Sequence, residues 1–160
     1  MRLRFGALRN PIHFVALGFG SGLAPYAPGT AGSLLALLPA WALFGLSMPW
    51  RFGVVVAVIG LGVWVCGASA RRLGVHDHGG IVFDEIAGVL ATALAAPSAS
   101  PLWLALVFVL FRIFDIWKPW PIRQLDHSVG GGVGIMLDDL MAAVYAAACL
   151  TTIRVLLPTT

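Results

Sequence analysis

The sequence predicts an all-α membrane protein, a polytopic helical bundle of about five passes with a Gly-rich N-terminal loop or re-entrant segment. Apolar residues make up 59% of the 160 residues, against roughly 45–50% in soluble domains. Charged residues make up 11%, less than half the usual share of about 25%. The mean hydropathy is +0.93. A chain this small cannot hide so much apolar surface from water, which excludes a soluble, disordered or coiled-coil protein.

The first half of the chain predicts one irregular segment and two passes. Residues 12–32 are too interrupted by Gly and Pro for a spanning helix, so we expect a loop or re-entrant turn packed against the protein. Residues 33–50 are apolar and uncharged and form the predicted first pass. Residues 52–70, also uncharged, would make a helix of about 28 Å, which matches a bilayer core and predicts the second pass.

Three later apolar stretches predict the remaining passes, at residues 81–96, 102–117 and 133–157. Polar or Pro- and Gly-rich turns precede them, at residues 73–80, 97–101 and 118–132. The length suits one compact domain, so residues 1–160 are predicted to form a single integral membrane domain.

The basic residues orient these passes. With the N-terminus in the cytoplasm, eight Lys and Arg fall inside and only Arg51 and Arg154 outside, as expected from the enrichment of Lys and Arg in cytoplasmic loops. The same threading places all the acids on or just under the cytoplasmic face. This is an independent observation, because the orientation is derived from Lys and Arg alone. The net charge of +3 comes without a basic patch interleaved with aromatics, so no nucleic-acid partner is expected.

Five carboxylates lie at helix ends that this threading brings together: Asp84, Glu85, Asp115, Asp138 and Asp139. An ionisable residue inside a membrane segment costs at least about 2.5–3.5 kcal/mol and marks a functional site by default. Neighbouring carboxylates repel one another unless protonated or bridged by a cation. We therefore predict a metal site, whose oxygen ligands favour Mg²⁺, Mn²⁺ or Ca²⁺ over zinc. The alternative is that Asp115 pairs with Arg112 or Lys118 while the other acids lie among hydrated headgroups.

Cations accompany these acids. Arg112, Asp115 and Lys118 recur at three-residue spacing on one side of a helix end, which suits phosphate bound by an Arg fork and a Lys point charge. Alternatively, they form a cationic belt that reaches the lipid headgroups. The Gly-rich stretches 18–33 and 130–134 each precede a helix, where backbone N–H groups can cradle phosphate, and Thr30 and Ser33 add hydroxyl groups to the first.

Two further patterns favour ordinary structural roles. Cys66 and Arg72 have the C-x₅-R spacing of cysteine-dependent phosphatases, but that loop needs an activated thiolate in a strand–loop–helix turn. Cys66 instead lies inside an uncharged span, so we expect an inert thiol. His76 and His78 flank Asp77 and could extend a metal shell, although simple polar roles are favoured.

Four runs carry a resemblance to a known family. The segments GFGSGLAPYAPGTAGS, IVFDEIAG, FRIFDIWKPWPIRQLD and GGGVGIMLDDL, in this order over residues 18–139, closely resemble the bacterial phosphatidylglycerophosphatase A family. The resemblance implies a small multi-pass enzyme of the inner membrane, active at its cytoplasmic side. It also implies Mg²⁺-dependent removal of the terminal phosphate of phosphatidylglycerophosphate to give phosphatidylglycerol. Two departures are the turn HDHGG at 76–80, where an Asp-Pro-type turn is expected, and Ala142-Ala143, where a Gly is common.

The resemblance assigns roles to the charged residues. Asp84, Asp115 and Asp138 are the expected catalytic residues, and with Glu85 and Asp139 they are the expected Mg²⁺ ligands. The expected phosphate-binding residues are Arg112, Lys118, Arg123, Thr30 and Ser33. The attacking group is water or an Asp, and we favour water because no single Asp is set apart.

Two other classes of membrane protein were weighed. A small divalent-cation transporter would need acids near mid-bilayer and a path to both faces, whereas all seven acids lie on one side of the predicted threading. An enzyme that transfers a phospho-alcohol from a nucleotide-linked lipid would need a spaced D-G-x₂-A-R pattern, which is absent. The oligomeric state stays open.

Overall fold

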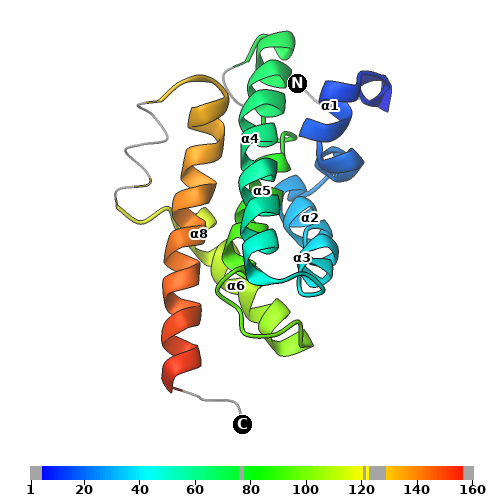
Figure 1. The fold of residues 1–160 in the computed structure, drawn as a ribbon. Coiled ribbons are helices and arrows are strands. Elements are labelled where there is room, and N and C mark those ends of the chain that lie inside the picture. Colours follow the sequence, from blue (N-terminus) through cyan, green and yellow to red (C-terminus); the bar gives the residue numbers. More distant parts are fainter. Residues whose placement is uncertain (1–4, 76–77, 121, 123–128, 157–160) are drawn as a thin grey trace.

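The computed structural model describes residues 5–75, 78–120, 122 and 129–156, and within them the chain is helical (Figure 1). This confirms the predicted all-α class. In chain order the elements are η1 (Phe5–Arg9), α1 (Pro11–Ala16), η2 (Gly18–Leu23), α2 (Pro28–Leu35), α3 (Leu37–Leu43), α4 (Met48–Leu73), α5 (Phe83–Ala93), α6 (Pro101–Trp117) and α8 (Gly131–Leu156).

Helices α4 and α8 form the long axis of the molecule. Each has 26 residues, or about 39 Å of helix, and they lie side by side in opposite directions (Figure 1). Among the described helices, these two are long and apolar enough to cross a membrane, by length and composition. They include the predicted second and fifth passes and indicate membrane association.

The predicted first pass is broken. Residues 33–50 do not form one helix, because α2 ends at Leu35, α3 covers Leu37–Leu43, and the last residues of the range already belong to α4. Pro39 supplies the physical reason. It has no N–H to bond the carbonyl of Leu35, and its ring clashes with that carbonyl in a continuous helix. Within residues 12–32, where we expect a loop or re-entrant turn, the chain forms α1, η2 and the start of α2.

The predicted third and fourth passes are short. Helix α5 has 11 residues and α6 has 17, which correspond to about 16 and 25 Å against a bilayer core of about 30 Å. The described helices therefore supply two clear candidate spans, where the sequence predicts about five passes.

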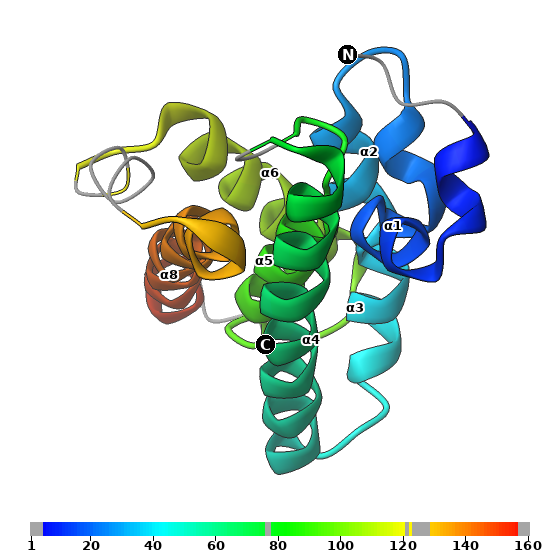
Figure 2. The same cartoon turned by 90° about the horizontal axis from the view of Figure 1, so that it is seen from above.

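Helix α5 lies at the centre of the bundle. It contacts α2, α3, α4, α6 and α8, which surround it when the molecule is seen from above (Figure 2). Nine of its residues are buried, among them the polar Asp84 and Thr92. The hydroxyl of Thr92 is satisfied within the helix, since it donates to the carbonyl of Gly88 at 2.9 Å. Groups at the start of α5 are therefore held inside the protein.

Polar contacts fix the N-terminal segment to α4. Asn10 caps α1 by accepting a hydrogen bond from Ile12 N at 3.0 Å, and it also accepts one from Arg72 at 3.0 Å. His13 Nδ1 lies 2.8 Å from the hydroxyl of Ser69. Burial, together with the charge of Arg72, lowers the pKa of His13. A neutral imidazole therefore joins α1 to α4 at neutral pH.

Glycine allows α4 and α8 to approach closely. A Cβ on Gly132 would overlap the carbonyl oxygen of Val63 in α4, and a Cβ on Gly67 would come within 2.8 Å of Gly132 N. Close backbone contact through small residues is typical of helix pairs in membranes. This contact fixes the position of α8 along its own axis relative to the rest of the bundle.

We predict that Gly132→Ala destabilises the fold by about 1–3 kcal/mol, because the overlap involves backbone that cannot move aside. The measurement is thermal unfolding in detergent micelles. Gly60→Ala is the matched control, since nothing lies within 4 Å of a Cβ there and Ala is a better helix former than Gly by about 1 kcal/mol. Equal or greater stability of Gly132→Ala would contradict the close crossing.

Candidate metal and phosphate site

Three carboxylates meet where α5 passes α8. Asp84 and Glu85 lie in the first turn of α5, and Asp139 lies in the third turn of α8. One oxygen of each lies within 4.8 Å of the others. Asp84 and Asp139 are only 8% and 3% exposed. The structure thus brings together three of the five acids expected to bind a metal, and we call Asp84, Glu85 and Asp139 the acid cluster.

Gly88 makes this meeting possible. It lies one turn after Asp84 on the same side of α5. A Cβ there would overlap the ring of Phe111 in α6 and come within 3.2 Å of the carbonyl oxygen of Asp139. Any larger residue would push α6 or α8 away from α5. The glycine of the IVFDEIAG run therefore keeps Asp139 beside Asp84.

The first turn of α2 closes the other side of the cluster. A Cβ on Gly29 would overlap Glu85 Oε1 and lie 3.2 Å from Nη1 of Arg112. Ala27, just before the helix, has a left-handed backbone with φ of 46°, a strained conformation for a residue with a side chain. Thr30 follows Gly29 in the same turn. The Ser33 hydroxyl donates to the carbonyl of Gly29 at 2.8 Å, so it stabilises this turn from within.

The other two acids pair with cations. Arg112 Nη1 contacts Asp115 Oδ2 within α6, and Lys118 Nζ lies 2.6 Å from Asp138 Oδ2. Lys118 ends α6 in a left-handed conformation with φ of 44°, and the Pro after it cannot continue the helix. The pairing of Asp115 with Arg112, which the sequence left open as an alternative, is therefore present beside the acid cluster.

Unsatisfied buried atoms show what this region can bind. Asp84 Oδ1, Glu85 Oε2 and Arg112 Nε are buried without a hydrogen-bond partner. Buried polar groups are normally paired, and unpaired charges there are costly. Three clustered carboxylates fit a hard divalent cation with oxygen ligands, and a guanidinium with an unused donor fits an anionic oxygen. The residues present thus suit a metal and a phosphate side by side.

The cysteine pattern does not form a phosphatase loop. Cys66 and Arg72 both lie in the continuous helix α4, Cys66 is fully buried, and Arg72 contacts Asn10. A strand–loop–helix turn is absent from this stretch, which the structure describes in full. His78 accepts a hydrogen bond from Gly80 N at 3.0 Å within its own turn. Arg123 and His76 lie outside the described residues.

Sequence reasoning missed the packing residues around the site. Gly88 could have been found from the sequence, because its four-residue spacing from Asp84 places it on the same side of the helix. Gly29 carried no such signal, since its contact with Glu85 joins segments far apart in the chain.

The loop after α6 is fastened to α8. Tyr145 Oη donates a hydrogen bond to the carbonyl of Trp120 at 2.9 Å, and the Tyr145 ring stacks on Phe114.

The chain is similar to known lipid phosphatases. The family model described as Phosphatidylglycerophosphatase A matches residues 14–154. A Phosphatidylglycerophosphatase A of Escherichia coli is 49% identical over 89% of this chain and 83% of its own length, and one of Haemophilus influenzae is 47% identical over 88% and 86%. A Bacteroides thetaiotaomicron protein, provisionally named a phosphatidylinositol-3-phosphatase, is 39% identical over 82% and 86%. No solved structure matches.

We predict that Gly29→Ala weakens divalent-cation binding roughly 10–100-fold, the usual cost of disturbing the groups that position ligands, because its Cβ would displace the Glu85 carboxylate. The measurement is the rise in unfolding temperature as Mg²⁺ or Mn²⁺ is titrated. Gly53→Ala, which has open space around its Cβ, should respond like wild type. A wild-type titration curve for Gly29→Ala would contradict a role for this contact.

Proposed function

The chain belongs to the phosphatidylglycerophosphatase A family, and we propose that its acid cluster and Arg112 carry out the reaction after which the family is named. In that reaction the terminal phosphate monoester of phosphatidylglycerophosphate is hydrolysed to phosphatidylglycerol, so the chain is a phosphoric monoester hydrolase. The observation that carries the assignment of the site is the clustering of three buried carboxyl groups next to an Arg with an unused donor.

Mg²⁺ is the proposed cofactor. Carboxylate oxygens are the ligands that it prefers, and lipid phosphates supply further oxygens. Asp84, Glu85 and Asp139 would hold the ion, and Asp115 and Asp138 could join them, because Asp115 interacts with Glu85 and Asp139 and Asp138 interacts with Asp139. When bound, Mg²⁺ supplies positive charge that stabilises the phosphoryl oxygens and favours ionisation of water.

Arg112 and Lys118 are the proposed phosphate-binding residues. Each now contacts a carboxylate, at Asp115 and Asp138, and phosphate oxygens can take the place of those carboxylates in the same geometry. Exchange of one anion for the other would free the two acids as the substrate arrives. Thr30, in the turn beside Glu85, can add a hydroxyl donor, while Ser33 keeps that turn in place. Arg123 remains a proposed contact.

Water is the proposed nucleophile. Asp115 and Asp138 each contact a cation in the substrate-free site, and no feature of the described residues sets either apart as a nucleophile. Asp84 Oδ1 has no partner and can accept a proton from the attacking water. The water oxygen then bonds to phosphorus, the bond from phosphorus to the glycerol oxygen breaks, and the proton passes to that leaving oxygen.

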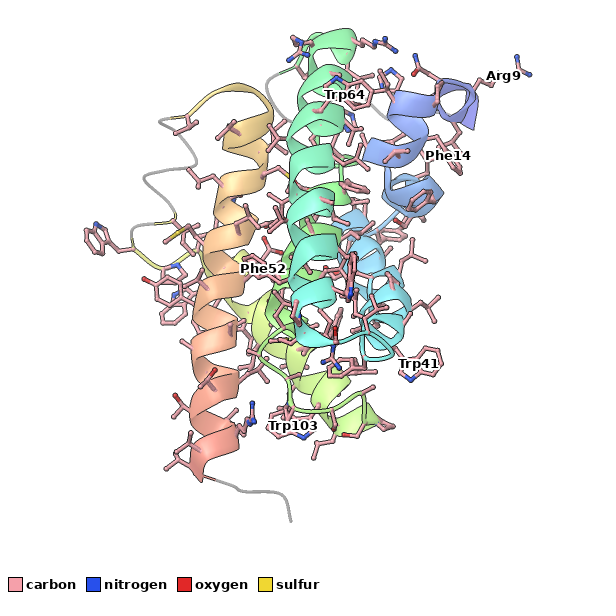
Figure 3. The ribbon with its side chains drawn as sticks, in the orientation of Figure 1. Arg9, Phe14, Trp41, Phe52, Trp64 and Trp103 are labelled. Carbon is pink, nitrogen blue, oxygen red and sulfur yellow. The ribbon has the colours of Figure 1, made fainter. Side chains whose placement is uncertain are left out.

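The proposed location is the bacterial inner membrane, crossed several times, with the site on the cytoplasmic side. Arg71 and Arg72 end α4 at the same end of the molecule at which α8 begins (Figure 1). Large apolar side chains point outward along the bundle, among them Trp41, Phe52 and Trp64 (Figure 3), each more than half exposed. Such a surface suits lipid rather than water. The shorter helices α5 and α6 would complete the passes inside this shell.

We predict that Asp84→Asn abolishes Mg²⁺-dependent phosphate release from phosphatidylglycerophosphate in detergent micelles. The loss should exceed the roughly 10–100-fold that follows removal of an outer-shell partner. Because the change removes a repelling charge, its unfolding temperature without Mg²⁺ should equal or exceed that of wild type. Cys66→Ser should keep its activity. Near wild-type turnover of Asp84→Asn, or an inactive Cys66→Ser, would overturn the proposed roles.

A second prediction concerns the membrane side. In a background with both Cys replaced by Ser, Ser98→Cys in the turn before α6 and Gly79→Cys in the turn before α5 report on opposite ends of α5; both positions are exposed. A membrane-impermeant maleimide applied to intact spheroplasts should label Ser98→Cys. It should label Gly79→Cys only after the membrane is opened. The reverse pattern would place the site outside, and labelling of both would contradict a spanning arrangement.

A further inference from the structure

An apolar cavity of about 240 Å³ lies between α5 and the segment that contains η2, α2 and α3. Its lining comes from η2, the α2–α3 junction and α5, and consists of Phe19, Leu35, Ala36, Leu38, Pro39 and Ile86. Every one of these side chains is apolar. The cavity is not part of the acid cluster and plays no role in the chemistry described above.

The broken helix creates this cavity. Pro39 ends α2 at Leu35, and the small side chain of Ala36 stands at the break, so no large side chain fills the space there. The opposite wall is Phe19, whose φ of 57° is left-handed, a costly conformation that recurs at functional sites. Its ring is 55% exposed and packs edge-on against Phe14, with ring centroids 5.5 Å apart. The wall is thus built from a strained aromatic residue at the surface.

The cavity lies close to the acid cluster along two elements, although no residue of the cluster lines it. On α5, Ile86 directly follows Glu85. On α2, Gly29 abuts the Glu85 carboxylate, and Leu35 lies six residues further along, or about 9 Å. A molecule with its phosphate at Arg112, whose Nη1 lies beside Gly29, could therefore extend along α2 toward the cavity with its next segment.

We propose that this cavity binds a fatty acyl chain of the lipid phosphate substrate and so holds the lipid in register with the acid cluster. The inference rests on the proposed function for the identity of the substrate. An acyl chain suits the lining because it has no polar groups to satisfy. A peptide would bury N–H and C=O groups without partners, which apolar surroundings do not tolerate.

The first test fills the cavity with Leu38→Trp. Leu38 is 68% exposed, so the larger ring can be accommodated without disturbing the core. KM for long-chain phosphatidylglycerophosphate should rise roughly 10-fold, as for a pocket that loses part of its apolar fit, while kcat/KM for the deacylated, water-soluble analogue stays unchanged. Leu34→Trp is the matched control, since Leu34 is 50% exposed and lies outside the cavity lining. Equal effects of the two variants, or a loss on both substrates, would overturn the proposal.

The second test does not depend on turnover. Phosphatidylglycerophosphate with a diazirine near the start of one acyl chain should label Phe19 or Leu38 on irradiation in micelles. Unlabelled phosphatidylglycerophosphate should compete, and phosphatidylcholine should not. Labelling elsewhere, or equal competition by phosphatidylcholine, would show ordinary annular lipid and overturn the proposal. If wild type labels here but releases no phosphate, the proposed function fails while the cavity assignment stands.

Discussion

The mutual repulsion of three buried carboxylates is the constraint on which the rest of this structure depends. Asp84, Glu85 and Asp139 come from two helices, and burial strengthens the interaction between their charges because the surroundings screen it weakly. Packing brings the two helices together, through the close contact that Gly88 allows with Phe111 and with the backbone of α8. The glycine contacts of α4 with α8 then fix the helix that carries Asp139. The cluster therefore lowers the stability of the cation-free protein and favours strong binding of a cation.

The neighbouring ion pairs limit how far this repulsion extends. Arg112 and Lys118 neutralise Asp115 and Asp138, which leaves the acid cluster as the region of uncompensated negative charge among the described residues. A phosphate dianion would be repelled by that cluster. Its approach is favoured only where the two cations can turn toward it and where positive charge occupies the cluster. The pairing of Asp115, which the sequence posed as an alternative to a site, is better understood as part of the site.

The sequence predicted what depends on composition and helix direction. Residues 52–70, which are uncharged, and residues 133–157, which are long and mostly apolar, are enough to identify α4 and α8, and the alternation of passes is enough to bring the helix ends with Asp84 and Asp139 together. It did not predict what depends on tertiary packing. Pro39 is visible in the sequence, but the prediction of one pass over residues 33–50 takes no account of it. The shortness of α5 and the contact of Gly29 with Glu85 follow from neighbours far away in the chain, which local patterns do not record.

The break between α2 and α3 is related to how deep the acids lie along α8. Asp139 lies eight residues into α8, about 12 Å from the start of that helix, so in the proposed membrane arrangement the acids would lie below the headgroups. The apolar hollow next to Ile86 lies against α5, the helix that also carries Asp84 and Glu85. In the proposed binding mode a lipid would keep its chain in this apolar hollow, and only its phosphate would leave the headgroup layer.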